Sequence, residues 1–377
     1  MTNCYDSVIV GAGVIGLSLA YELSNRGQRT AIIDRQQPGQ EASWAGAGIL
    51  PAAKLSTTAP SRDQLCALSQ QLHAQWAPRL YEQTGINTGY RRSGEIHIAR
   101  DPQDRLRLNE QVAKWRNDSL DVEELDPSHL EEIEPALACL SNSQTVLAAY
   151  RLPDTCQVRN PRHVRALLSA CQQNGVDVLS GAPCDSWEVK RGRVQAVHAG
   201  DQRLEADSFC LTAGVWSKAL LQQINIRIPL KPVRGQMALL TCPTRPFRSV
   251  ITENSRYLVP RDDGRVLVGS TEDDVGMDVR TTTQGISGLL NFATSLVDGL
   301  KIAQLERCWA GLRPSTPDGL PILDRAPELD NLYIATGHFR GGIHLSTGTA
   351  HVLATWITGS NAEIDTSDFW LKRFTAS

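Results

Sequence analysis

Long apolar runs, concentrated charge of one sign and paired cysteines are all missing from this sequence of 377 residues. No apolar stretch approaches the roughly 20 residues that a transmembrane helix needs, so we expect no membrane span. The 38 basic and 41 acidic residues are spread along the chain without a basic tail. Nucleic acid is therefore not expected as a partner, because phosphate binding needs concentrated Lys and Arg.

The nine cysteines form none of the spacings that bind metals or carry redox chemistry. They are scattered and odd in number, and none lies in a CxxC or Cys/His pattern. Such cysteines are typical of reduced, mostly buried thiols. We therefore expect a cytoplasmic protein without disulfides or a metal site. The cysteines are Cys4, Cys66, Cys139, Cys156, Cys171, Cys184, Cys210, Cys242 and Cys308.

What the sequence does contain begins with a strand–helix–strand unit. A short apolar run covers 5–10, helical periodicity covers 14–26, and a second strand pattern covers 29–34. A loop of small residues at 41–49 then leads to a long amphipathic helix at 61–84. The first part of the chain is therefore predicted to be a βαβ unit.

Two kinds of pattern interleave in the rest of the chain. Helix and buried strands return at 160–180, 208–214 and 332–359, whereas 227–310 alternates apolar and polar residues in strands. This favours a mixed α/β (α+β overall) fold, with a doubly wound Rossmann-like domain and an antiparallel-sheet domain inserted between its segments. The predicted Rossmann-like domain covers 1–86, 151–225 and 313–377, and the inserted domain covers 87–150 and 226–312.

The segment VIVGAGVIG carries a GxGxxG motif directly after the first strand. Gly11 is expected to make the tight turn and Gly13 to let a pyrophosphate approach the backbone, while Gly16 lets helix and strand pack closely. The pyrophosphate would lie at the helix N-terminus, where free N–H groups and the helix dipole favour negative charge. A glycine-rich turn without a ligand is the alternative.

Asp34 ends the second strand, 18 residues after Gly16. A carboxylate there suits the hydroxyls of an adenosine ribose and disfavours the 2′-phosphate of NADP. Because strand, helix, second strand and acid are all in place, we predict dinucleotide binding. The motif does not separate FAD from NAD.

Six segments in the same order resemble the FAD-dependent D-amino-acid oxidase superfamily, and within it the glycine oxidases of thiamine biosynthesis. The resemblance covers essentially the full length. The segments are VIVGAGVIG, SWAGAGIL, LTAGVWS, YLVPRDDGRVLVGST, CWAGLRPSTPDGLPILD and GHFRGGIHLSTGTA.

The resemblance implies FAD, bound noncovalently because the C-terminal stretch 337–349 has no cysteine to attach it. It makes the Rossmann-like domain the FAD-binding domain and the inserted one the substrate-binding domain. For Cys184, a buried structural thiol is an equally good interpretation. The implied cofactor contacts are Gly11, Gly13, Val14, Ile15, Gly16, Asp34, Arg35, Ala42, Ser43, Ala47, Gly48, Ile49, Cys184, Gly214, His338, Phe339, Arg340, Gly341, Gly342, Ile343 and His344.

Three residues match family positions that surround the substrate carboxylate: Tyr257, Arg313 and Arg340. A guanidinium gives a carboxylate two parallel charge-assisted hydrogen bonds, and a phenol can add a third donor. The alternatives are a structural ion pair for Arg313, capping of nearby carbonyls for Arg340, and packing on the sheet for Tyr257. We expect no catalytic side chain beyond the flavin, so His338 is kept as a cofactor contact only.

The implied reaction is oxidative deamination of glycine or another small amino acid. Hydride would pass to flavin N5, giving an imine or 2-oxo acid, ammonia and, with O2 as acceptor, hydrogen peroxide. A role in thiamine thiazole synthesis is also implied. A sarcosine or D-amino-acid oxidase or dehydrogenase, and a flavin-binding protein without turnover, stay open as alternatives, as does a homo-oligomer.

Overall fold

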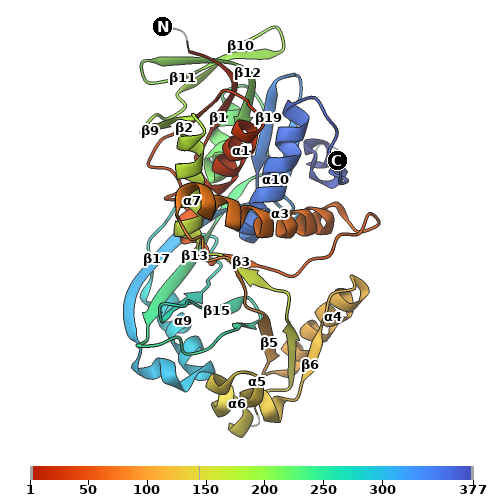
Figure 1. The fold of residues 1–377 in the computed structure, drawn as a ribbon, viewed down its shortest axis with the longest axis vertical. Coiled ribbons are helices and arrows are strands. Elements are labelled where there is room, and N and C mark those ends of the chain that lie inside the picture. Colours follow the sequence, from red (N-terminus) through yellow and green to blue (C-terminus); the bar gives the residue numbers. More distant parts are fainter. Residues whose placement is uncertain (1–2, 144, 375–377) are drawn as a thin grey trace.

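Two large sheets of eight strands each organise the chain. The computed structural model describes residues 3–143 and 145–374. The sheets follow one another along the long axis of the molecule, and α3 (Ser61–Thr84) crosses between them (Figure 1). Each sheet belongs to a different kind of architecture, as the interleaved sequence patterns predict.

The first sheet is parallel at its centre and antiparallel at its edges. Strand β1 pairs in parallel with β2 and β12, β2 with β9, and β12 with β19. Hairpins β10–β11–β12 and β18–β19 add the antiparallel edges. The bounds are β1 (Asn3–Val10), β2 (Thr30–Asp34), β9 (Asp177–Ser180), β10 (Ser186–Lys190), β11 (Arg193–Ala199), β12 (Gln202–Leu211), β18 (Ile322–Arg325) and β19 (Leu332–Thr336).

Helices on the first sheet bury their apolar residues against it and against each other. They are α1 (Val14–Asn25), α7 (Asn160–Gln173) and α10 (Gly342–Ile357), with the short α8 (Ser217–Gln222) after β12. Both α1 and α3 pack on α10, and α7 packs on α1. Because β1 and β2 are covered by such layers, Ile9, Ile32 and Ile33 are fully buried.

The second sheet is antiparallel except for one pair, because β14 runs parallel to β5. Its strand order is β17-β13-β16-β15-β14-β5-β7-β6. The bounds are β5 (Glu95–Ala99), β6 (Glu123–Leu125), β7 (Ala148–Leu152), β13 (Lys231–Thr241), β14 (Val250–Glu253), β15 (Arg256–Pro260), β16 (Arg265–Gly269) and β17 (Gln304–Ser315). Residues 262–264 form the turn between β15 and β16.

One helix lies where the sequence pattern suggested strands alone. Within 227–310, α9 (Thr283–Leu296) buries Leu289, Phe292 and Leu296, which have helical spacing. The Thr282 side chain caps it by accepting a hydrogen bond from the Gly285 N–H at 3.1 Å. The other helices beside this sheet are α4 (Pro102–Asn117), α5 (Leu130–Ile133) and α6 (Ala138–Ser143).

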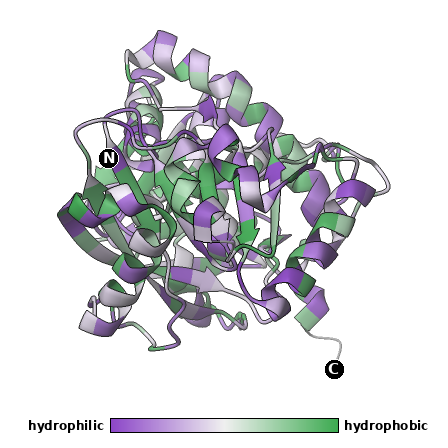
Figure 2. Cartoon of the chain, turned by 90° about the horizontal axis from the view of Figure 1, so that it is seen from below, coloured by the Kyte–Doolittle hydropathy of each residue, from purple (hydrophilic) through white to green (hydrophobic). Residues whose placement is uncertain are grey.

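A small third sheet joins the two halves. It consists of β3 (Ile49–Leu50), β8 (Cys156–Gln157) and β4 (Arg91–Arg92). The segment 41–49, expected to be a loop, contains a single turn of helix, α2 (Ala42–Ala45), and the start of β3. Apolar strand residues fill the interior of the molecule, and polar residues face outward on the helices (Figure 2).

The division into two domains stays a proposal. Two of its boundaries, after residues 150 and 312, fall inside β7 and β17.

All nine cysteines are free thiols. Among the described residues, no helix is both long enough and apolar enough to cross a bilayer.

Candidate active site

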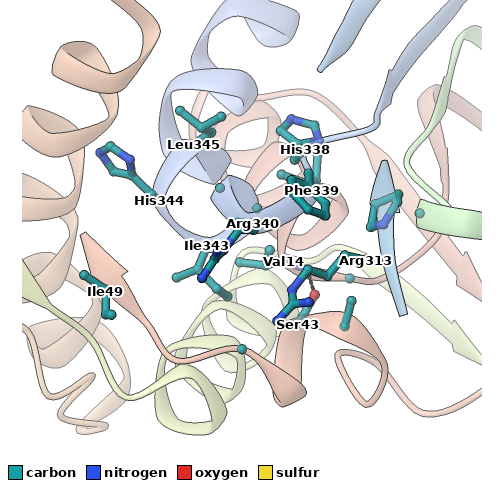
Figure 3. Close-up of a pocket in the computed structure, with 18 of the residues that line it drawn as sticks. Val14, Ser43, Ile49, Arg313, His338, Phe339, Arg340, Ile343, His344 and Leu345 are labelled. Carbon is teal, nitrogen blue, oxygen red and sulfur yellow. Dashed lines mark hydrogen bonds between the residues drawn. The ribbon is translucent and has the colours of Figure 1, made fainter. Parts of the chain in front are cut away.

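A cavity of about 890 Å³ is lined by residues from both large sheets. Of the residues that the resemblance assigns to cofactor or substrate, all but Gly16 line it. Figure 3 shows Val14, Ser43, Arg313 and labelled residues of the 338–345 segment, Arg340 among them, around the same space. The structure therefore brings together residues that lie more than three hundred positions apart.

The glycine turn between β1 and α1 leaves no room for side chains. Gly11 has φ +109°, and a Cβ there would lie 2.8 Å from the backbone of Ala213. A Cβ on Gly16 would lie 1.9 Å from the Gly11 carbonyl oxygen. That oxygen also accepts a hydrogen bond from Thr212 Oγ1 at 2.7 Å. Gly16 thus serves the close packing of helix on turn, as its motif position predicts.

Asp34 is tied to the same turn. Its Oδ2 accepts a hydrogen bond from the Ala12 N–H at 2.7 Å, and its Oδ1 accepts one from the Gln36 N–H at 2.9 Å. Burial raises the pKa of the carboxyl above its ordinary value. Helix α1 has no acidic residue in its first turn, and the Val14 N–H donates to Ser43 Oγ at 2.8 Å. This end of the cavity is suited to a ribose and a pyrophosphate.

Further candidate contacts surround the glycine turn. The Arg35 guanidinium stacks 3.6 Å from the Trp216 ring centroid and pairs with Glu41 at 2.6 Å. Cys184 is half-buried, and burial raises the pKa of its thiol to about 12, so it is not a reactive thiolate. Gly214 has φ +54°.

A buried arginine holds the segment after α2, at 46–49, by hydrogen bonds. Sequence patterns did not indicate this residue. Arg261 donates to the Ala47 carbonyl at 2.7 Å and to the Val158 carbonyl at 2.9 Å. Burial lowers the pKa of its guanidinium to about 9. A Cβ on Gly48 would lie 2.2 Å from the Val158 carbonyl oxygen. In the sequence, Arg261 could be noticed only as an arginine next to the Asp262–Gly264 turn. Its hydrogen-bond partners, Ala47 and Val158, are distant in sequence and could not be inferred from it.

The start of α10 forms another wall of the cavity. The helix has no acidic residue in its first turn, and Phe339 before it has φ +47°. His73 on α3 holds this turn, with Nε2 at 3.0 Å from the carbonyl oxygens of Ile343 and His344. Burial lowers the pKa of His338 to about 3, so the ring is neutral, 3.1 Å from Thr349 Oγ1.

Two helix N-termini, neither with an acid in its first turn, therefore face one cavity. Such helix ends stabilise negative charge. The glycine turn fits a pyrophosphate, and the start of α10 fits the electron-rich edge of a flavin ring. The residues present thus fit FAD.

Arg313 lies on β17 with its guanidinium held between strands. Its Nη2 donates to Ser270 Oγ at 2.7 Å and its Nη1 to the Thr271 carbonyl at 3.1 Å. Gly235 on β13 makes this possible, because a Cβ there would lie 2.2 Å from Nη2. Burial lowers the pKa of Arg313, although Tyr257 and Glu272 oppose the shift. Its remaining donors stay available to an anion in the cavity.

Arg340 makes a carbonyl contact of the kind given as its alternative role, and also an ion pair that its sequence did not reveal. Its Nη1 pairs with Glu272 Oε1 at 2.7 Å, and its Nη2 donates to the Ser255 carbonyl at 2.6 Å. Tyr257 directs its hydroxyl toward Met237 Sδ, 3.6 Å away. Ser255 and Asn254, just before Tyr257, line the cavity as well. Arg340 therefore links the start of α10 to the loops at the ends of β14 and β16.

Comparisons with known proteins identify the family. The family model described as DAO, FAD dependent oxidoreductase, matches residues 6–356. The chain is 30% identical to a glycine oxidase of Pseudomonas putida over 96% of this chain and 97% of that protein. A crystal structure of glycine oxidase from Geobacillus kaustophilus superposes with a TM-score of 0.92, at 30% identity and 99% coverage of both chains.

A longer relative is also similar. The bifunctional protein ThiO/ThiG of Trichormus variabilis is 31% identical over 98% of this chain. The chain spans about half of that protein, 55% of its length.

Across residues 3–143 and 145–374, no group of three or more His, Cys, Asp or Glu side chains is arranged to hold a metal ion.

Proposed function

This chain belongs to the DAO family of FAD-dependent oxidoreductases, and we propose that it oxidises glycine or another small amino acid. FAD is its cofactor, as the family description states. The observation that carries the proposal is Arg313, a guanidinium held in place by Ser270 and Thr271 in the cavity that the glycine turn also lines. A carboxylate is the natural ligand of such a guanidinium.

The side chains of this cavity act by binding and orientation. Arg313 would hold the substrate carboxylate, with Tyr257 as an additional donor and Arg340 as a second cation at the cavity wall. When bound, FAD supplies two-electron oxidation, taking hydride from the substrate α-carbon and passing the electrons to O2 as hydrogen peroxide. The carboxylate clamp fixes where the α-carbon lies, which is the contribution of this chain to the rate.

Proton transfer is not assigned to a protein base. The amine must be neutral when its α-carbon is oxidised, and water can take that proton. His338 lies on the cavity wall with its pKa lowered to about 3 by burial, so it is neutral and hydrogen-bonded to Thr349. We propose that it is a structural part of the cofactor site.

The proposed product is an imine that hydrolyses to glyoxylate and ammonia or feeds thiazole synthesis for thiamine. The similarity to the bifunctional ThiO/ThiG protein supports this pathway role. The nine free thiols support a reducing compartment, such as the cytoplasm.

A substrate panel tests the proposal. Purified FAD-loaded protein is mixed with glycine, sarcosine, D-alanine and D-proline in air, and peroxide is measured. We expect glycine to be oxidised with formation of peroxide. Turnover of D-proline or D-alanine well above glycine would instead favour a D-amino-acid oxidase, and peroxide from none of them would overturn the proposed transfer of electrons to O2.

The Arg340–Glu272 pair gives a specific prediction. Glu272→Gln should tighten the binding of glycolate, a carboxylate without an amine, because Arg340 loses a competing anion. For an exposed ion pair worth at most about 1 kcal/mol, the dissociation constant should fall about two- to fivefold. Titration of the flavin absorbance measures it.

The matched control is Asp274→Asn, which removes another exposed ion pair in the same segment, with Lys231 at 2.8 Å. It should leave glycolate binding unchanged. Weaker glycolate binding by Glu272→Gln would contradict the prediction and show that Glu272 holds Arg340 in its binding position.

A further inference from the structure

The wall of the cavity continues along the second sheet beyond Tyr257. In the strand register, Tyr257 on β15 pairs with Thr252 on β14, and Thr252 pairs with His97 on β5. Side chains at paired positions point to the same face of a sheet. Neighbouring strands lie about 4.8 Å apart, so the His97 backbone is roughly 10 Å from that of Tyr257. All three residues line the cavity.

At the far end of this row lies a buried carboxylate. Glu95 precedes His97 by two residues, so it shares the same face, and it also lines the cavity although it is only 5% exposed. Thr252 Oγ1 donates to its Oε1 at 2.6 Å and Thr155 Oγ1 to its Oε2 at 3.4 Å. His97 Nε2 lies 3.4 Å from Oε1.

The neighbours of this carboxylate favour its ionised form. Burial alone would raise the pKa of Glu95, but His97 and the hydroxyls of Thr252 and Thr155 bring it below its ordinary value. A carboxylate has about four acceptor positions, so the bonds from Thr252 and Thr155 leave capacity for another donor.

An aromatic ring completes this end of the cavity. The Trp115 ring on α4 lies 4.7 Å from the His97 ring and lines the same space. A carboxylate beside an indole is a combination that favours a cation, through ion pairing and through the ring face. Nearby Lys114 is paired with Asp63 at 3.6 Å, which reduces its competition for Glu95.

A purely structural role for Glu95 would not require a buried carboxylate on the wall of the cavity. Taking an ionised carboxylate out of water costs several kcal/mol, and hydroxyl donors recover only part of that cost. Arg313 and Arg340 line the same cavity as Glu95, so the cavity wall carries both cationic and anionic side chains.

We propose that Glu95, His97, Thr252 and Trp115 form a second binding site, which holds the cationic end of a substrate whose carboxylate is bound by Arg313. The substrate class is an amino acid, or an N-substituted glycine, whose substituent ends in an ammonium or guanidinium group. Lysine and arginine are members of this class. Glycine would leave this end of the cavity to water. The inference rests on the proposed function and extends its substrate class to amino acids with a cationic side chain.

The test compares lysine with norleucine, which has a similar length but no cation. The holoenzyme is assayed with both enantiomers of each, and kcat/KM is taken for the better enantiomer. We expect the wild-type protein to prefer lysine at least about tenfold, a difference of about 1.4 kcal/mol. Glu95→Gln, which keeps the size of the side chain and an acceptor for Thr252, should reduce this preference to near unity.

The control is Glu253→Gln. Glu253 follows Thr252 on β14, pairs with Arg100 at 2.6 Å, and is not among the residues that line the cavity. Its variant should keep the lysine preference. Oxidation of glycine or norleucine without a wild-type preference for lysine overturns this inference alone, and that comparison needs no variant. Failure of glycine, sarcosine, D-alanine, norleucine and lysine alike to be oxidised overturns the proposed function as well.

Discussion

Replacing Arg313 with leucine should lower kcat/KM for glycine at least about a hundredfold while FAD stays bound. The guanidinium is the cation that Ser270 and Thr271 hold within the cavity, and a leucine offers no donor to a carboxylate. Losing a buried, charge-assisted contact of this kind costs about 3–5 kcal/mol. Steady-state kinetics measure the loss, and the flavin absorbance of the purified variant reports cofactor content.

Arg307→Leu is the matched control for this experiment. Arg307 lies on the same strand β17, exposed and 5.7 Å from the Trp44 ring centroid, and it does not line the cavity. Its variant should keep kcat/KM within about twofold of wild type, since surface substitutions are usually worth less than 0.5 kcal/mol. If Arg313→Leu oxidises glycine as well as wild type, the carboxylate clamp is assigned wrongly.

Replacing Gly16 with alanine should weaken FAD binding by about five- to 150-fold. The new Cβ would lie 1.9 Å from the Gly11 carbonyl oxygen and 2.6 Å from Thr212 Oγ1. Helix α1 must then move away from the turn that faces the pyrophosphate, and overpacking of this kind costs about 1–3 kcal/mol. Titration of the apoprotein with FAD measures binding, and thermal unfolding measures the accompanying loss of stability.

Gly288→Ala controls for a generic glycine effect. A Cβ at Gly288, within α9, would meet nothing within 4 Å. Because alanine favours helix by about 1 kcal/mol over glycine, this variant should be at least as stable as wild type and bind FAD equally. Unchanged FAD affinity and unfolding temperature in Gly16→Ala would contradict the role given to the glycine turn.

Sequence patterns predicted well those elements whose structure is determined by residues close together in the sequence. The β1–α1–β2 unit was predicted because apolar periodicity changes from strand to helix at the glycines, and Gly16 then meets Gly11 only five residues away. Helix α9 was missed although Leu289, Phe292 and Leu296 have helical spacing, since the strand patterns around it dominated. The one-turn helix α2 was too short for any periodicity to indicate.

Partners from distant strands could not be predicted. Arg313 stood out as a candidate, but the space for its guanidinium depends on Gly235, 78 positions earlier. Likewise Arg340 finds Glu272, 68 positions away. Such pairs follow from strand register and from the contact between the two sheets. The family resemblance identified Arg313 and Arg340 as candidates, and the structure shows which residues surround them.

Anaerobic mixing of the FAD-loaded protein with glycine tests the central proposal most directly. The yellow absorbance, near about 450 nm for an oxidised flavin, should bleach with wild-type protein and persist with Arg313→Leu at the same substrate concentration. Wild-type protein that stays yellow with glycine, sarcosine and D-alanine alike would contradict the proposed oxidation of a small amino acid.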